Sequence, residues 1–127
     1  MAYSPSNSRH LSNQSVTTTD ATVTTIKTIP IKGASVARII AIITGKRTGG
    51  TAGNVNDAAS YWVTATVKAI NGTATIVGAV AVLSASEDQV AWDGTIDVSG
   101  GTAIVTVAGA ANNNVTWNAK IEVIENL

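Results

Sequence analysis

The 127-residue chain contains no cysteine and no phenylalanine, and its only histidine is His10. Without cysteine the chain has neither a disulfide framework nor a thiolate metal site. One histidine cannot supply the several nitrogen or sulfur ligands that a zinc site needs. We therefore expect no metal centre and no cofactor. A calcium site at Asp57, or at Glu87 and Asp88, stays an alternative, although their spacing does not resemble a calcium loop.

Charge and long apolar runs are also scarce. Charged residues make up 13% of the chain and the formal net charge is zero, so the surplus of Lys and Arg that binds phosphates is missing. No run approaches the roughly 18 apolar residues that a membrane-spanning helix needs. Residues 1–20 lack the basic start and apolar stretch of a secretory signal. These absences predict a protein that is made in the cytoplasm and binds neither nucleic acid nor membrane.

Alternation of apolar and polar residues is what the chain does contain. Val115–Val123 alternates without an error, which predicts a strand with Trp117 in the core, near Trp92. Similar runs occupy residues 21–31, 36–44, 61–70, 73–83, 91–99 and 102–108. Asn71-Gly72 between two of these runs is a strong hairpin signal. The pattern predicts an all-β chain, as an antiparallel β-sandwich or small barrel of about seven strands.

The first twenty residues differ from the rest in composition. They are mostly Ser, Asn, Thr and Gln, with few apolar side chains. Such a segment cannot bury enough apolar area to offset the entropy of ordering it. We expect residues 1–20 to be an extended N-terminal arm, either flexible or docked on a neighbour. Residues 21–127 are expected to form a single β-domain.

The segment Val36–Thr44 predicts an assembly surface. It is apolar on both faces of the expected strand, and a strand of this kind is central or has one face against a partner subunit. The core residues are small, so a single domain of this size is only marginally stable by itself. We therefore expect homo-oligomers, as trimers, with the polar face of residues 116–122 away from the contact. The expected assembly interface consists of Val36, Arg38, Ile40 and Ile42.

Three further residues are expected to make surface contacts. Residues 45–59 are rich in Gly and predict a long loop, whose Lys46 and Arg47 would face an acidic partner. The loop does not match a phosphate-binding pattern. Trp62 falls on the mostly polar face of the next strand. There it either stacks on a sugar ring or lies at a subunit interface.

No combination of residues predicts catalysis. His10 lies in the expected arm, where a general base would have no fixed geometry. Asp93 and Asp97 share one face of a strand at a separation of roughly 13 Å, which is too far to share a proton and wider than a glycosidase pair. We expect that the chain is not an enzyme.

Three segments resemble parts of structural proteins of tailed bacteriophages. They are Lys46–Gly53, the run Glu87–Val98 with its Trp92, and Val105–Val123 with its Gly/Asn-rich loop and Trp117. Similar segments occur in virion proteins and at the ends of tail-fibre-like proteins. The resemblance implies a virion component that is built of β-strands and works as an oligomer. It implies no particular functional residues.

Together, the residues and the resemblance predict a non-enzymatic virion protein made in the cytoplasm of the bacterial host. Our first interpretation is an oligomeric capsid decoration or head-associated protein. It would dock on the shell, and so on the major capsid protein, through residues 1–20. The alternative is a tail or fibre-tip module that binds a host surface receptor or glycan through residues 45–59 and 109–114.

Overall fold

The computed structural model describes residues 8–127, which form eight β-strands and no helix. The strands are β1 (Ser8–Thr18), β2 (Thr24–Pro30), β3 (Val36–Gly49), β4 (Ala58–Ile70), β5 (Thr73–Glu87), β6 (Asp93–Ser99), β7 (Thr102–Ala108) and β8 (Asn114–Asn126). All strand pairs are antiparallel. The all-β prediction is therefore confirmed, with one strand more than expected. Over this part of the chain no helix is long and apolar enough to cross a membrane.

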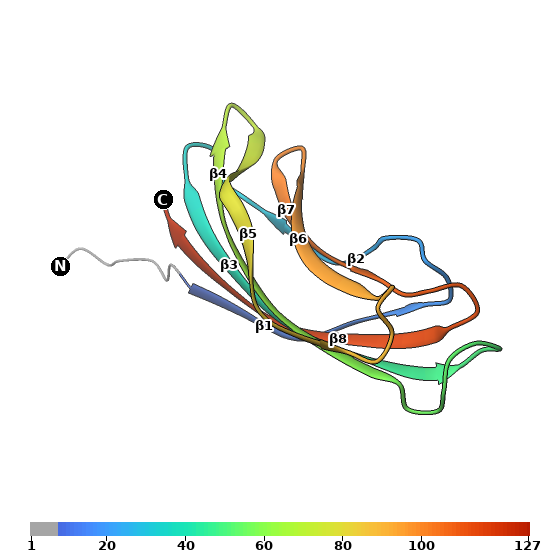
Figure 1. Ribbon diagram of the computed structural model, residues 1–127. Coiled ribbons are helices and arrows are strands. Elements are labelled where there is room, and N and C mark those ends of the chain that lie inside the picture. The colour runs from blue at the N-terminus through green and yellow to red at the C-terminus, as the bar shows by residue number, and fades with distance from the viewer. Residues whose placement is uncertain (1–7) are drawn as a thin grey trace.

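The eight strands form two sheets, and neither of them closes into a barrel. The larger sheet has the order β1-β8-β3-β4-β5 and the smaller one has the order β2-β7-β6. Figure 1 shows the long strands of the larger sheet curving past the shorter strands of the smaller one. Of the two architectures expected, the chain therefore adopts the sandwich. The two-faced segment at Val36–Thr44 lies in β3, which is the central strand of the larger sheet, as expected.

The core lies between the two sheets and follows the alternation in the sequence. Each inward residue of β8 from Val115 to Val123 is at most 1% exposed. Trp117 lies edge-on to Trp92, with the ring centroids 5.7 Å apart, so the predicted contact between these two rings is confirmed. The Trp117 indole Nε1–H donates a hydrogen bond to Thr18 Oγ1 at 2.9 Å. The core is thus small aliphatic side chains packed around one aromatic cluster.

Local turn signals are also confirmed. Asn71 and Gly72 both have positive φ, at 52° and 78°, and they join β4 to β5 as a hairpin. Pro30 ends β2, which is an edge strand of the smaller sheet with a bulge between Thr25 and Lys27. Proline lacks the backbone donor that a central strand needs, so its place at an edge follows directly.

The arm expected over residues 1–20 needs correction where the structure describes it. Residues 8–18 form β1, which pairs with β8 along the edge of the larger sheet. Backbone hydrogen bonds to β8, with Leu11 and Val16 packed against the core, order a segment whose side chains are mostly polar. The β-domain thus begins before residue 21. Residues 1–7 lie outside the described part, and the expectation for them stays a prediction.

The long loop expected over residues 45–59 is also shorter than predicted. Strand β3 continues to Gly49 and β4 begins at Ala58, so only residues 50–57 connect them. Lys46 pairs with Ala58 on one side and with Thr116 on the other. Glycines in the sequence suggested a loop, but neighbouring strands on both sides supply the hydrogen bonds that keep this segment extended.

Candidate functional site

The outer face of the larger sheet, which points away from the smaller sheet, is the candidate functional surface. A sheet with one face on the core normally carries polar residues on the other. Here five apolar side chains on that face are 42–47% exposed. They are Val36, Ile42, Trp62, Val77 and Ile124. The gathering of exposed apolar side chains on one sheet face makes the outer face the candidate surface for contacts.

Strand register places Trp62 beside a row of hydroxyl groups on this face. Trp62 in β4 pairs with Ile42 in β3. One row further along, Thr44 pairs with Ser60, and Ser60 pairs with Ser86 in β5. Residues from three strands thus form an aromatic platform next to a band of three hydroxyls, which we call the Trp62 platform. Trp62 itself is 46% exposed, so its ring is available for stacking.

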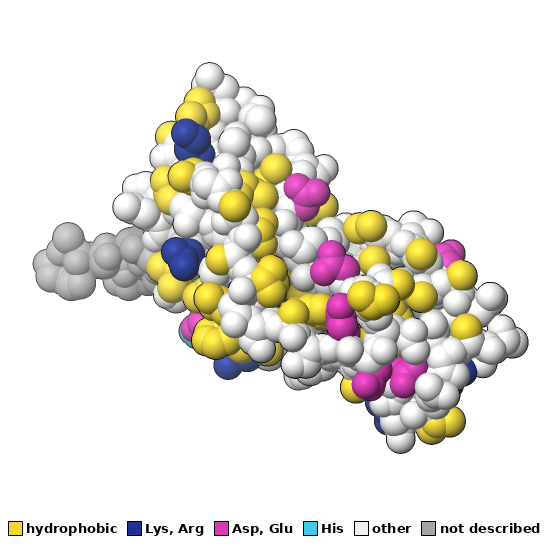
Figure 2. All heavy atoms as spheres, in the orientation of Figure 1, with side chains coloured by type: hydrophobic (Ala, Val, Ile, Leu, Met, Phe, Trp, Pro, Cys, Tyr) yellow, Lys and Arg dark blue, Asp and Glu magenta, His cyan; other side chains and the backbone are white. Residues whose placement is uncertain are grey.

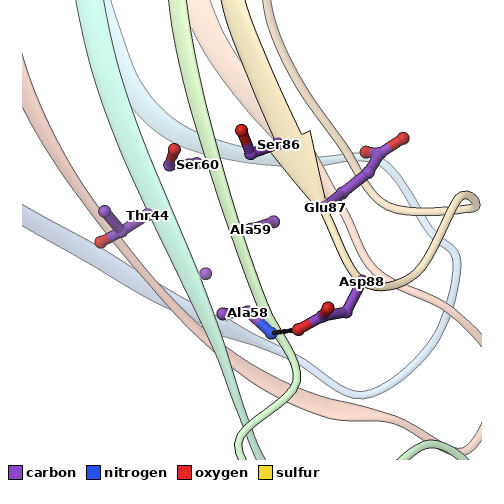
Figure 3. A pocket seen from close by; sticks show the side chains of 8 residues that line it. Thr44, Ala58, Ala59, Ser60, Ser86, Glu87 and Asp88 are labelled. Atoms are coloured by element: carbon purple, nitrogen blue, oxygen red, sulfur yellow. Dashed lines mark hydrogen bonds between the residues drawn. The ribbon is translucent and has the colours of Figure 1, made fainter.

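The hydroxyl row lines an open depression of about 590 Å³ (Figure 3). Its lining residues are Thr44, Gly45, Ala58, Ala59, Ser60, Ser86, Glu87 and Asp88. In Figure 3 the hydroxyls of Ser60 and Ser86 project from neighbouring strands, with Thr44 on the next strand. The small side chains keep the depression wide, and the lining contains acidic groups but no Lys or Arg. Such a surface suits a ligand with many hydroxyl groups and no negative charge.

Both carboxylates of the depression are held by protein partners. Glu87 accepts a hydrogen bond from the Tyr61 hydroxyl. Burial of the ring, and then the bond and charge of Glu87, raise the pKa of Tyr61, which therefore stays a donor. Asp88 Oδ2 accepts a hydrogen bond from the Ala58 backbone N–H at 2.9 Å (Figure 3). Glu87 pairs with buried Ala59, and in Figure 3 its carboxylate points away from the hydroxyl row, so Asp88 is the carboxylate placed to accept a further hydrogen bond from a ligand there.

The residues expected to form an assembly interface share the outer face. Val36, Arg38, Ile40 and Ile42 project from β3 opposite its buried residues. Arg38 Nε–H donates a hydrogen bond to Thr64 Oγ1 at 2.8 Å, which holds the guanidinium against β4. The structure brings these four residues together on one face, and their role in assembly stays a prediction.

The expectation that residues 116–122 face away from this surface is wrong. In the register of β3 and β8, Ile42 pairs with Lys120 and Ile40 pairs with Glu122. Neighbouring strands share their two faces, so the polar side chains of β8 lie beside the apolar side chains of β3. The outer face is therefore mixed, with an apolar centre and charged side chains around it.

Lys46 and Arg47 lie in β3, which corrects their expected place in a loop. Arg47 instead joins the β3–β4 loop to the β7–β8 loop. Its Nη2 donates to Gly50 O at 2.7 Å, and its Nε donates to Ala52 O at 2.8 Å and to Asn113 Oδ1 at 3.2 Å. A planar guanidinium with several donors suits this bridging role. Arg47 thus has a structural role here.

Replacing Arg47 with alanine is expected to lower the free energy of unfolding by about 2 kcal/mol, because partly buried acceptors lose a charged donor. The two loops should also become more sensitive to protease. Urea unfolding followed by circular dichroism, with limited proteolysis, measures both effects. Lys46→Ala, at the exposed neighbour, is the matched control and should change stability by less than about 0.5 kcal/mol. Equal effects of the two changes would contradict the bridging role.

A second polar junction supports the same loops. Asp57 is 7% exposed, and its Oδ2 accepts hydrogen bonds from the Asn54 backbone N–H at 2.8 Å and from Gln89 Nε2 at 2.7 Å. The bond from Asn54, and then that from Gln89, hold the pKa of this carboxyl below its usual range. Asp57 therefore tethers the loop rather than presenting a free carboxylate. Within residues 8–127 no group of three or more His, Cys, Asp or Glu could hold a metal ion.

His10 lies in β1 and not in a loose arm, so its side chain has a fixed place on the sheet. Its Nδ1 lies 3.3 Å from Glu122 Oε1, and its side chain is 61% exposed. The pairing of β1 with β8 brings the two residues opposite each other. His10 and Glu122 therefore form a solvent-exposed pair on the outer face.

The hydroxyl row was not apparent from the sequence. Thr44, Ser60 and Ser86 are common polar residues at separate positions in the chain, and only the register of β3, β4 and β5 brings them into one row. Their shared signal is that each takes an outward position near the same end of its strand. Alternation predicts that position, but it does not predict which strands are neighbours.

No protein-family model matches this sequence, and no curated protein matches it. Among solved structures, the chain is similar to the tailspike protein of Acinetobacter baumannii phage AM24, with 13% identity and a TM-score of 0.58. The match covers 93% of this chain and 26% of that protein, so the chain spans about a quarter of its length. At this identity the likeness establishes a shared fold.

Two other phage tailspikes show weaker likenesses. One is from Acinetobacter phage vB_ApiP_P1, at 14% identity and a TM-score of 0.37, covering 99% of this chain and 22% of that one. The other, from Acinetobacter baumannii bacteriophage Fri1, is described as a capsular polysaccharide depolymerase. It matches at 13% identity and a TM-score of 0.39, over 94% of this chain and 19% of its own. These TM-scores are too low for a comparison of folds.

Proposed function

We propose that this chain is a non-catalytic, tail-associated bacteriophage module that binds a neutral glycan of the host surface on the Trp62 platform. The observation that carries the proposal is the exposed Trp62 ring beside the hydroxyls of Thr44, Ser60 and Ser86. The fold shared with part of a phage tailspike supports a tail location. The resemblance of three sequence segments to phage virion proteins independently supports a virion protein.

The chemistry of the platform suits a sugar. An aromatic ring stacks on the apolar face of a pyranose, and hydroxyls with carboxylate oxygens exchange hydrogen bonds with the ring substituents. Because the depression is lined by Glu87 and Asp88 and by no Lys or Arg, it favours a neutral saccharide over an acidic one. This chemistry favours the tail-module interpretation over our first one.

The non-catalytic part of the proposal rests on the carboxylates. Glu87 is bonded to Tyr61 and Asp88 to a backbone N–H, so each has a positioning partner. Asp93 and Asp97 are alternate outward residues of β6, on the other sheet. A hydrolase needs an acid and a second carboxylate on opposite sides of one bond. The groups at the platform are better suited to hold a sugar than to cleave it.

Capsid decoration stays a prediction with less support than before. It was motivated by an arm at residues 1–20 that would dock on the shell. The described part of that arm, β1, instead uses its backbone to pair with β8. A segment committed to its own sheet cannot also extend across a shell without first unpairing.

Replacing Trp62 with alanine is expected to weaken binding to host cells about fivefold, because the stacked ring contributes on the order of 1 kcal/mol. Pull-down on host cells and an array of neutral and acidic oligosaccharides measure the effect. Trp62→Tyr keeps a ring and should retain most binding. Val77→Ala, on the same face and 47% exposed, is the matched control.

Loss of binding without a change in thermal unfolding would support the Trp62 platform. Two results would contradict it: a Trp62→Ala protein that binds host cells as well as the parent, or a parent protein that binds no oligosaccharide and no cells. Preferential binding to acidic sugars would contradict the inferred ligand class.

A further inference from the structure

The edge strands of the two sheets are protected unequally. An exposed sheet edge invites pairing with another chain, and natural edges discourage this with charged residues or proline. Over residues 8–127 the edges are β1 and β5 in the larger sheet and β2 and β6 in the smaller one. The protecting residues are Arg9 and His10 on β1, Lys27 and Pro30 on β2, and Asp93 and Asp97 on β6. From Thr73 to Ser86, β5 has neither a charge nor a proline.

Strand β5 is also apolar and exposed. Val82 is 59% exposed and Leu83 is 53% exposed. Val82 lines a groove of about 400 Å³ at the open side of the sandwich, together with Val90, which is 91% exposed. Figure 2 views this side, where hydrophobic side chains gather with acidic ones between them. We call Val82 and Val90, with Glu87 and Asp93 at the groove, the open-side surface.

The open-side surface and the outer face carry opposite charges. The groove lining includes Glu87 and Asp93 but no Lys or Arg. The end of the outer face at Val36 is basic, because Arg38 and Lys68 face outward there and Lys120 lies further along the same face. The acidic residue Glu122 on that face lies against His10. Each copy of the chain therefore carries one acidic and one basic surface, both with exposed apolar side chains.

We propose that the open-side surface of one copy packs against the outer face of a second copy, at the end that carries Val36, Arg38 and Ile124. The two surfaces match in their apolar content and are complementary in charge, which favours this partner over one of unrelated chemistry. The contact is head-to-tail, so it repeats from copy to copy and gives a closed ring or an open filament according to the rotation between copies. The zero net charge of the chain leaves no overall repulsion between copies.

The bulges of β5 decide how the second copy is held. The register with β4 shifts at Thr64/Thr66 and again at Trp62/Val63, and Gly78 has a φ of 74°. Bulges bend a strand and interrupt its row of backbone groups. The second copy is therefore held by side-chain packing and charge, and the sheet does not continue across the contact.

This contact leaves the Trp62 platform accessible. Val36 pairs with Lys68, and Trp62 lies six residues before Lys68 along β4. At the usual rise of a strand this is about 20 Å. The basic end of the outer face and the platform can therefore be occupied together. Glu87 lines both the depression and the groove, so the open-side surface borders the depression, and separate variants, Trp62→Ala for the platform and Val82→Lys for the contact, distinguish failure of one proposal from failure of the other.

Native mass spectrometry and sedimentation of the full chain test the proposal with two charge variants. Val82→Lys places a positive charge opposite the basic end of the outer face, and Ile124→Glu places a negative charge opposite the acidic open side. We expect the parent to assemble and each variant alone to associate at least tenfold more weakly.

A 1:1 mixture should recover a complex that contains both variants, because the introduced lysine of one then faces the introduced glutamate of the other. Val55→Lys and Val23→Glu, at positions 83% and 67% exposed, are the matched controls and should assemble like the parent.

Circular dichroism of each variant checks that the fold is retained. A parent that stays monomeric at high concentration would overturn the proposal, and so would variants that assemble like the parent. Failure of the mixture to form a joint complex would overturn the head-to-tail pairing. Added salt should weaken assembly, since the charges attract across the contact. The mass of the assembly also measures whether it is the trimer predicted from the sequence.

Discussion

Replacing Trp117 with alanine is expected to lower the free energy of unfolding by about 4 kcal/mol, the largest effect of any single change proposed for this chain. Trp117 is fully buried, and its ring lies 5.7 Å from that of Trp92 and 6.4 Å from that of Tyr61. Its removal leaves a cavity between the two sheets and takes away the donor to Thr18 Oγ1. A loss of this size is a large part of the stability of a small domain.

Urea unfolding followed by circular dichroism measures the change. Trp62→Ala provides the matched control, because that ring is half exposed and its loss should cost less than about 1 kcal/mol. If Trp117→Ala does not fold, Trp117→Phe keeps the prediction testable, with an expected loss of about 2 kcal/mol. Similar stabilities for the Trp117 and Trp62 variants would show that Trp117 does not organise the core.

Replacing Gly45 with alanine is the second large expected effect, with a loss of about 3 kcal/mol from overpacking. Gly45 pairs with Trp117 across β3 and β8, and the indole covers its α-carbon. A Cβ at this position would lie 2.5 Å from Trp117 Cζ3 and 2.7 Å from its Cε3. The ring is packed on its other sides and cannot move away, so the strand must shift instead.

Gly33→Ala is the control for this change, since a Cβ there meets no atom within 4 Å and the backbone is ordinary. It should alter the unfolding free energy by less than about 0.5 kcal/mol. A double variant that combines Gly45→Ala with Trp117→Leu should lose less than the sum of its parts, because the smaller side chain makes room for the added methyl group. Additive losses in that cycle would mean that the two positions do not clash.

The two faces of the larger sheet contribute differently to the protein. The inner face supplies stability through Trp117 and its neighbours. The outer face presents the Trp62 platform at one end and a basic, partly apolar end at Val36 and Ile124. Because β3, β4 and β8 contribute to both faces, a change that disorders the core should also disturb the platform. Stability is therefore measured beside binding in each test.

Alternation along single strands was sufficient to predict much of this arrangement. It placed Val115–Val123 with Trp117 inward, it placed Trp62 outward, and Asn71-Gly72 marked a hairpin. These properties depend only on neighbours in the chain, since a strand directs successive side chains to opposite faces and a turn needs residues that tolerate positive φ. Alternation thus predicted that these segments are strands, which side chains of each strand point inward, and that the two core tryptophans are in contact.

Only the tertiary structure decided which strands are neighbours, and with that the site. Polar residues 8–18 become a strand because β8 offers a backbone edge, and Lys46 and Arg47 stay extended because partners lie on both sides. Strands from distant segments pair through backbone hydrogen bonds, which residues of almost any type can form. The composition of a segment therefore says little about which strand it pairs with. By itself the sequence determined an all-β chain and the direction of each side chain. The order of the strands then assembled the hydroxyl row beside Trp62 and left at an edge the strand β5, whose residues 73–86 contain neither a charge nor a proline.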